Sequence, residues 1–194
     1  AIWYRFPGRS IKIVMITGTK GKTSTAELIN TVLNEAGYKT ALSSTIRINI
    51  AEAVSPNLYK MTTPGRFFLQ KFLREAVKKK CDWAVIEMTS QAVVQYRHYF
   101  IDFDALVFTN IAPEHIESHG SFENYLAAKL KLAHALDRSP KRPRISISNL
   151  DDPHGKKFFL LTAEKKLGFR LSDPFPYQTE LLGDFNKLNI LAAA

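Results

Sequence analysis

The sequence predicts an α/β fold in which a mostly parallel sheet is flanked by helices. Short apolar runs rich in β-branched residues alternate along the chain with longer segments of helical periodicity. Several of these runs are almost continuously apolar, which is typical of strands buried on both faces of a parallel sheet. Glycine and polar residues follow directly after the runs, at the carboxyl ends of strands where such sheets bind ligands.

The composition limits what kind of protein this is. The chain has 194 residues, of which 45% are hydrophobic, enough for one domain with a sizeable core. A net charge of +9 favours anionic partners, nucleic acid included. A single cysteine, Cys81, excludes an intrachain disulfide and a Cys-rich metal site and suits a reducing compartment. Since neither a signal peptide nor an apolar run of roughly 18 residues is visible, we expect a cytoplasmic protein without a membrane span.

The first elements follow one another as strand, glycine loop and helix. "IKIVMI" at 11–16 predicts a strand, and "STAELINTVLNEAG" at 24–37 predicts a helix that ends at a glycine. Residues 39–50 predict a second strand region. A helix is expected within 62–81, and "WAVIEM" at 83–88 has the pattern of a buried strand.

The alternation continues through the second half of the chain. "DALVFTNI" at 104–111 predicts a strand, 122–136 a helix and 144–152 a further strand. Between 156 and 182 the pattern is too weak to place elements. The chain opens without an initiator Met, and "NKLNILAAA" ends it within a predicted helix. We therefore expect an excerpt of a longer protein.

The stretch "GTKGKTS" predicts a phosphate-binding loop. A glycine loop between a strand and a helix presents several backbone N–H groups to one anion. Lys22 can reach terminal phosphates, and the Thr23 hydroxyl can ligate Mg²⁺. Residues 18–23 match the short pattern G-x-x-G-K-T, because Ile16 stands where the usual, longer P-loop pattern has glycine. The alternative interpretation is a glycine turn with incidental lysines. The candidate nucleotide-binding residues are Gly18, Thr19, Lys20, Gly21, Lys22, Thr23 and Ser24.

Other residues with chemical potential lie near the predicted strand ends. Glu87 closes a buried strand, where a carboxylate needs a partner, and Mg²⁺ prefers hard oxygen ligands. Glu87 and Thr23 thus form a candidate metal site, with a lysine-paired Glu87 as the alternative. His115 and His119 lie in a loop, where histidines are more often surface residues. Lys129, on a partly apolar helix face, is interpreted from its position alone as a snorkelling side chain.

Four signatures, in order, make the chain resemble the Mur ligase family, ATP-dependent amide ligases of peptidoglycan precursor synthesis and thus of cell wall biogenesis, cell shape and cell division. They are "GTKGKTST", "EMTSQAVVQYR", "TNIAPEHIESHGSFENYLAAK" and "LLGDFNKLNILAA". "TTP" at 62–64, the Q-x-R ending and the "HG" at 119–120 resemble the MurE branch, which adds the third stem-peptide residue to UDP-MurNAc-dipeptide. The resemblance implies a P-loop NTPase-like central domain over residues 1–194, with the N-terminal UDP-binding and C-terminal ligase domains absent from this chain.

The resemblance also implies roles for individual residues. Lys22 would bind the β- and γ-phosphates of ATP, Thr23 and Glu87 one Mg²⁺, and His115 a second Mg²⁺. Lys129 matches a lysine that is commonly carbamylated in the family, which makes it a candidate catalytic residue with Lys22 and His115. Asn186 would contact the nucleotide base region. The residues that match positions holding the peptide part of the UDP-MurNAc substrate are Thr62, Thr63, Thr89, Gln95 and Arg97.

Three other functions remain open at this stage. A folylpolyglutamate synthase or another Mur-like ligase would share the loop and the metal site. A basic nucleic-acid or anion-binding module would use Lys78–Lys80 and "KRPR", and a scaffold would bind nucleotide without catalysis. The resemblance favours small-molecule partners (UDP-MurNAc-peptide, an amino acid and ATP) over a specific nucleic acid. We expect a monomer, and little activity from this domain alone.

Overall fold

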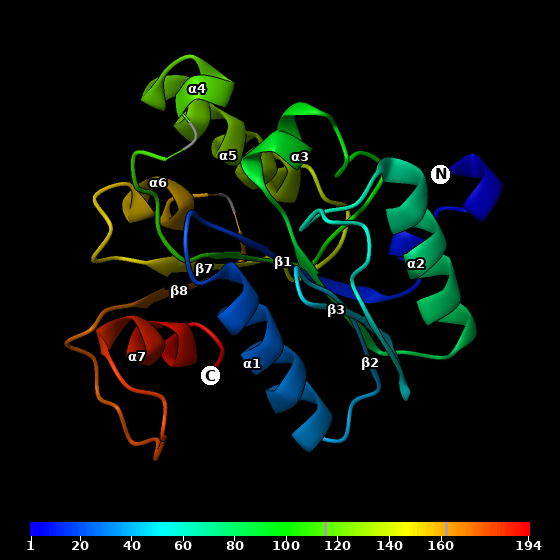
Figure 1. The fold of residues 1–194 in the computed structure, drawn as a ribbon, viewed down its shortest axis with the longest axis horizontal. Helices are drawn as coiled ribbons and strands as arrows, with labels where there is room; N and C mark the ends of the chain where they lie inside the picture. Colours follow the sequence, from blue (N-terminus) through cyan, green and yellow to red (C-terminus); the bar gives the residue numbers. More distant parts are fainter. Residues whose placement is uncertain (115, 162) are drawn as a thin grey trace.

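Eight strands form a single sheet in the computed structural model, in the order β4-β3-β2-β5-β1-β6-β7-β8 (Figure 1). The pairs from β2 through β8 are all parallel, whereas β3 runs antiparallel to both of its neighbours. The structure describes residues 1–114, 116–161 and 163–194. The predicted α/β class with a mostly parallel sheet is therefore confirmed.

The bounds of the elements are as follows. The strands are β1 (Lys12–Thr17), β2 (Thr40–Ser43), β3 (Arg47–Ile50), β4 (Ala53–Pro56), β5 (Trp83–Glu87), β6 (Ala105–Phe108), β7 (Ile145–Asn149) and β8 (Lys165–Phe169). The helices are α1 (Lys22–Glu35), α2 (Arg66–Lys78), α3 (Ser90–Val94), α4 (Ile116–His119), α5 (Phe122–Asp137), α6 (Gly155–Phe159) and α7 (Asp184–Leu191). Two short 3-10 helices, Ile2–Tyr4 and Pro7–Arg9, precede β1.

Two apolar cores lie on opposite faces of the sheet. Successive side chains of a strand point to opposite faces, so Ile13 and Met15 of β1 pack with α2, α5 and α6, while Val14 and Ile16 pack with α1 and α7. Figure 1 shows α1 and α7 together on one side of the sheet and α5 and α6 on the other. Burial on both faces is the reason that these strands read as continuous apolar runs.

The structure resolves two regions that the sequence left undivided or unplaced. Residues 39–50 form two strands, β2 and β3, which turn back on each other at Ser44–Ile46 and continue into β4. Within 156–182 lie most of α6 and all of β8. The outermost strands β4 and β8 are largely exposed, so their residues lack the apolar pattern by which a buried strand is predicted.

The central strands bring the predicted site residues to one edge of the sheet. β2, β5, β1 and β6 are neighbours and parallel, so their carboxyl ends lie side by side. Residues 18–23 follow β1, Glu87 ends β5, Thr45 follows β2 and Asn110 follows β6. Within the described part of the chain, none of the helices combines the length and the apolarity needed to cross a bilayer.

Candidate nucleotide and metal site

Two glycines allow the loop between β1 and α1 to fold tightly against its surroundings. Gly21 is the N-cap of α1 and has a φ of 80°, in the left-handed region that favours glycine. A Cβ at Gly21 would lie 2.4 Å from Asn189 Oδ1, and a Cβ at Gly18 would lie 1.9 Å from Thr109 Oγ1. The close approach of β6 and α7 to the loop therefore requires glycine at both positions.

Residues at the end of β6 hold the loop in place. The Thr19 N–H donates to the Asn110 carbonyl at 2.9 Å, and the Lys20 N–H donates to Asn110 Oδ1 at 2.9 Å. The Lys20 carbonyl accepts from Thr109 Oγ1 at 2.8 Å and from Asn110 Nδ2 at 3.0 Å. The loop is thereby fixed next to the first turn of α1, whose N–H groups have no partners within the helix and face anions favourably.

Lys22 lies over this loop. Its Nζ donates to the carbonyls of Gly18 and Thr19 at 3.0 and 2.8 Å. Burial lowers the pKa of Lys22, while the negative charges of Glu87 and Glu114 act in the opposite direction. A cation held among backbone carbonyls in a glycine loop is well placed to exchange these contacts for phosphate oxygens.

Glu87 is fully buried at the end of β5 and is bound by hydroxyl and amide groups. One carboxylate oxygen accepts from the Thr45 N–H at 2.8 Å, and the other accepts from the hydroxyls of Thr23 and Thr45 at 3.0 and 3.1 Å. Burial raises the pKa of Glu87, and these hydrogen bonds oppose the rise. Among the described residues no lysine or arginine lies within ion-pair distance of Glu87. The positive charge of Lys22 nevertheless acts on the carboxylate and also opposes the rise in its pKa.

The donor set around Glu87 fits magnesium. A carboxylate beside two hydroxyls supplies hard oxygen ligands, and Mg²⁺ takes one or two protein groups together with phosphate oxygens and waters. The described residues contain no cluster of three or more His, Cys, Asp or Glu side chains that could hold a metal ion. His115, the predicted ligand of a second ion, lies outside the described residues.

Lys129 extends from α5 to the same loop, so its interpretation as a snorkelling side chain is wrong. Its side chain is buried, with 1% of the residue exposed, and its Nζ donates to the Gly18 carbonyl at 2.8 Å. The Nζ also lies 4.7 Å from the ring centroid of Tyr125, whose hydroxyl is 2.9 Å from Thr19 Oγ1. Burial, aided by the nearby charge of Lys22, lowers the pKa of Lys129 well below its usual value. These conditions favour a neutral amine.

The predicted substrate threonines flank Glu87. The Thr62 hydroxyl lies 3.0 Å from Thr45 Oγ1, next to the hydroxyls of the candidate metal site. Thr63 is buried, donates to the Glu87 carbonyl at 2.8 Å and accepts from the Thr89 N–H at 3.1 Å. Thr89 caps α3 by accepting from the Ala92 N–H at 3.2 Å. Thr62 thus lies at the site, whereas Thr63 and Thr89 shape the backbone around it.

Gln95 and Arg97 lie beside these threonines. The Arg97 guanidinium donates to the Thr63 carbonyl and to Gln95 Oε1, and both residues line an open cavity of about 490 Å³. A planar guanidinium at a cavity wall can bind a carboxylate through two parallel hydrogen bonds.

A pocket of about 130 Å³ lies beside the loop, between β6 and α7. It is lined by Lys20, Gly21, Thr109, Asn110, Asn149, Phe169, Phe185, Leu188 and Asn189. Asn186, the predicted base contact, is outside this lining and donates to the Leu182 carbonyl at 2.8 Å. Asn189, one helical turn later, instead meets Gly21 and accepts from Thr25 Oγ1 at 3.3 Å.

The sequence interpretation therefore missed Thr45, Asn110, Tyr125 and Asn189. Asn110 lies two residues after the end of β6, and its place at a strand end was a usable signal. Asn189 carried a signal too, because it lies three residues after Asn186, and residues three apart share one face of a helix. Thr45 had none, since it depended on finding the turn between β2 and β3.

Comparison with known proteins identifies the family. The protein family described as "Mur ligase middle domain" matches residues 16–173 of this chain. The chain belongs to this family. As a Mur ligase middle domain, it keeps the glycine loop, Glu87 and Lys129 within the matched range.

Named relatives of this Mur ligase middle domain are peptidoglycan precursor enzymes. It is 36% identical over 159 residues to the UDP-N-acetylmuramoyl-L-alanyl-D-glutamate--2,6-diaminopimelate ligase of Syntrophomonas wolfei, covering 82% of the chain and 32% of that protein. It is 33% identical over 228 residues to the UDP-N-acetylmuramyl-tripeptide synthetase of a Roseiflexus species, covering 100% of the chain and 45% of that protein. The chain thus spans less than half the length of these relatives.

Solved structures agree on the fold of the Mur ligase middle domain. A UDP-N-acetylmuramoyl-L-alanyl-D-glutamate--2,6-diaminopimelate ligase superposes with a TM-score of 0.79 at 26% identity, covering 94% of this chain and 42% of the other. The folylpolyglutamate synthase of Mycobacterium tuberculosis, solved with ADP, superposes with a TM-score of 0.60 at 17% identity, covering 87% and 44%. The second likeness concerns the fold alone.

Proposed function

We propose that this chain is the ATP-binding domain of a ligase that adds an amino acid to UDP-MurNAc-dipeptide in peptidoglycan precursor synthesis. The observation that carries the proposal is that Glu87 and Lys129, from two distant segments, meet the glycine loop that contains Lys22. The names of the relatives support this substrate class, as does the Thr62 hydroxyl next to the metal-site hydroxyls.

The reaction proceeds in two steps. The carboxylate of the acceptor attacks the γ-phosphorus of ATP, which releases ADP and leaves an acyl phosphate. The amine of the incoming amino acid then attacks the acyl carbon and loses a proton, and inorganic phosphate leaves as the amide forms. Phosphoryl transfer depends chiefly on positioning and on neutralising charge.

The residues of the loop bind and orient the triphosphate. The N–H groups at the start of α1 face the phosphates, and Lys22 contacts the β- and γ-phosphate oxygens. Thr23 and Glu87 hold the magnesium ion, which when bound neutralises phosphate charge. The pocket between β6 and α7 receives the base and sugar part of ATP. Asn186 lies on α7, the helix that forms one wall of this pocket, and contacts the base region from there.

The acceptor binds on the other side of Glu87. Thr62 contacts the peptide part of the acceptor, and Thr63 and Thr89 shape the backbone beside it. Arg97, held by Gln95 and the Thr63 carbonyl, pairs with a carboxylate. In this proposal the reacting carboxylate lies next to the magnesium ion. We assign the reaction to the cytoplasm and propose that the protein is a monomer.

Lys129 acts as a carbamate, and His115 binds a second magnesium ion. The neutral amine of Lys129 attacks CO₂, an N–C bond forms, and the amine proton is released to solvent, which leaves a carbamate anion. The buried amine beside Lys22 supports this step, because only a neutral amine is nucleophilic. The anion would then balance the charge of Lys22.

Replacement of Lys129 by Met should change how stability depends on pH. Because the folded state lowers the pKa of Lys129, its contribution to stability is present above the unfolded pKa of about 10.4 and is lost as pH falls toward the folded value. In CO₂-free buffer the free energy of unfolding of the unmodified chain should therefore fall as the pH decreases from the unfolded pKa to the folded pKa. The total fall should be about 1.4 kcal/mol for each unit by which the pKa is lowered. The variant should lack this part of the slope.

The same variant tests the carbamate. With ¹³C-labelled bicarbonate, the unmodified chain should give a carbamate carbon signal that Lys129→Met lacks. Lys131→Met, on the same helix, is the control and should keep the signal. A pH slope identical in the Lys129 variant, or a signal that persists in it, would contradict the assignment.

The proposed function is tested by phosphate release from the full-length gene product. ATP, Mg²⁺ and UDP-MurNAc-dipeptide are supplied with a panel of amino acids, and a folate acceptor with glutamate is the parallel arm. We expect release only with the UDP-linked acceptor and one class of amino acid. Release with the folate acceptor alone would assign the chain to the folylpolyglutamate synthases, whose fold it shares.

A further inference from the structure

Among the described residues, Thr45 supplies two of the three hydrogen bonds that the Glu87 carboxylate accepts. Its N–H donates to one oxygen at 2.8 Å and its hydroxyl to the other at 3.1 Å, while Thr23 provides the third bond. Thr45 lies in the turn between β2 and β3, outside any regular element. The conformation of this turn therefore sets the direction in which the carboxylate of Glu87 points.

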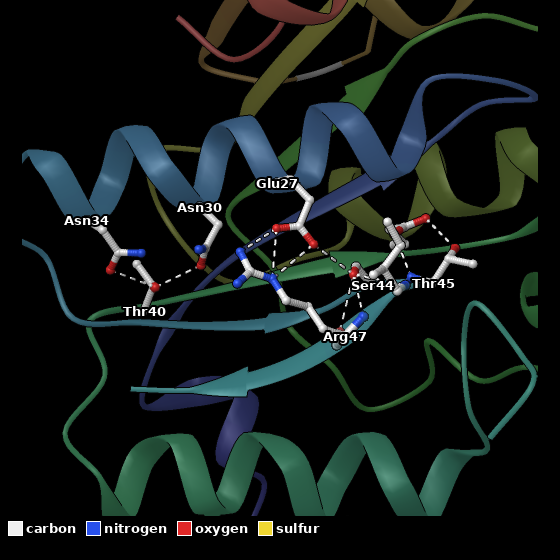
Figure 2. A network of polar contacts seen from close by, with 9 residues as sticks. Glu27, Asn30, Asn34, Thr40, Ser44, Thr45 and Arg47 are labelled. Atoms are coloured by element: carbon white, nitrogen blue, oxygen red, sulfur yellow. Dashed lines mark hydrogen bonds and ion pairs between the residues drawn. The ribbon is translucent and has the colours of Figure 1, made fainter. Parts of the chain in front are cut away.

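An ion pair joins this turn to α1. The Arg47 guanidinium donates to Glu27 through Nε, at 3.2 and 3.0 Å to the two oxygens, and through Nη2 at 2.6 Å. Both side chains are partly buried, 35% and 25% exposed, and a forked pair of this kind is well defined in direction. Figure 2 shows the two side chains facing each other between α1 and the hairpin of β2 and β3.

Ser44 connects the ion pair to the backbone of the turn. Its hydroxyl oxygen, Ser44 Oγ, lies 3.1 Å from Glu27 Oε1. Ser44 Oγ also accepts from the N–H groups of Ile46 and Arg47 at 3.3 and 3.1 Å. The hydroxyl thus lies between a carboxylate on α1 and two turn amides, next to Thr45 in the chain (Figure 2). A contact network of this kind leaves the turn few alternative conformations.

A second contact fixes the helix against the same strand. The Thr40 hydroxyl of β2 lies 2.8 Å from Asn30 Oδ1 and 3.0 Å from Asn34 Oδ1 (Figure 2). Because α1 also begins with Lys22 and Thr23, the helix that binds phosphate and the turn that orients Glu87 are held at a set distance.

We propose that Glu27, Ser44 and Arg47 form a positioning device that holds Thr45 against Glu87 and thereby sets the affinity of the site for magnesium. The proposal rests on the proposed role of Glu87 as a magnesium ligand. None of the three residues touches the metal or the nucleotide. Partners of this type orient metal ligands, and their loss typically weakens metal binding by roughly 10- to 100-fold.

The experiment measures ATP affinity by calorimetry on the 194-residue chain, once with Mg²⁺ and once with EDTA. Glu27→Gln, Arg47→Met and Ser44→Ala should each reduce the Mg²⁺-dependent gain in affinity by roughly tenfold and leave the affinity in EDTA nearly unchanged. The double variant Glu27→Gln/Arg47→Met should lose little more than either single variant, because the two residues act as one unit. Glu164→Gln, in the forked Arg144–Glu164 pair at the opposite edge of the sheet, is the matched control and should keep the full gain.

The signs of the effects separate positioning from a simple field effect. A field effect predicts that Glu27→Gln weakens and Arg47→Met strengthens magnesium binding, and that the uncharged change Ser44→Ala does nothing. Positioning predicts a loss in all three. Opposite signs, or an unchanged Ser44→Ala, would overturn the proposal if Glu87→Gln still removes the gain. If Glu87→Gln keeps the gain, the assignment of Glu87 fails, and this proposal fails with it.

Discussion

Lys22→Ala should abolish turnover and weaken ATP binding by roughly 100-fold. The ammonium now lies over the loop against two backbone carbonyls, and in the complex it would donate charge-assisted hydrogen bonds to the phosphates. Hydrogen bonds to charged groups contribute about 1.5–3 kcal/mol each, and about 1.4 kcal/mol corresponds to a tenfold change in affinity. Two such bonds account for the expected loss.

The fold should survive this substitution, because burial disfavours the charged form of Lys22 and its removal eliminates that cost. Thermal unfolding of the variant should therefore match that of the unmodified chain within a few degrees. Lys166→Ala, at an exposed position of β8, removes the same charge far from the loop and should leave ATP affinity unchanged. Unchanged affinity in Lys22→Ala itself would refute the phosphate-binding role.

Glu87→Gln should remove most of the gain in ATP affinity that Mg²⁺ provides, by roughly 100-fold, while ATP binding in EDTA changes little. The amide keeps the size of the carboxylate and an oxygen that accepts from the Thr45 N–H, but it loses the charge that attracts the cation. Loss of a direct ligand should exceed the roughly tenfold loss expected for the positioning residues.

Calorimetry under the two conditions measures both quantities in one preparation. Glu75→Gln, at a half-buried position of α2, is the charge-matched control and should behave like the unmodified chain. Equal losses with and without Mg²⁺ in Glu87→Gln would mean that the residue supports the loop rather than the metal. The pKa of Glu87 adds a further expectation: because burial raises it, magnesium should compete with a proton for this carboxylate, and binding should weaken as the pH is lowered.

The elements with strong local signals were predictable. β1, β5 and β6 are nearly continuous apolar runs because both faces of each strand are buried, and α1 and α5 carry periodic apolar positions. The glycine loop was predictable for a similar reason, since its chemistry is contained in seven consecutive residues between a strand and a helix. Exposed edge strands such as β8 gave no comparable signal.

Lys129 and Thr45 show where local patterns are insufficient. Position on a partly apolar helix suggested a snorkelling side chain, yet α5 packs so that the amine of Lys129 ends at Gly18, 111 residues away in the chain. Thr45 carries no signal of its own. It matters because its turn lies next to the end of β5, where its N–H contacts Glu87. Contacts between segments so far apart depend on the packing of whole elements.

By itself, the sequence predicted the α/β class, the glycine loop and the candidate residues for binding ATP and magnesium, because these predictions depend on residues close together in the chain. The tertiary structure alone decided which of these groups meet. It brings Glu87 and Lys129 to the loop that contains Lys22, and it brings Thr45 into contact with Glu87. It also joins Glu27, Ser44 and Arg47 in the proposed positioning device. The physical reason is the parallel sheet, which brings the carboxyl ends of distant strands to one edge where side chains from separate segments come within hydrogen-bond distance.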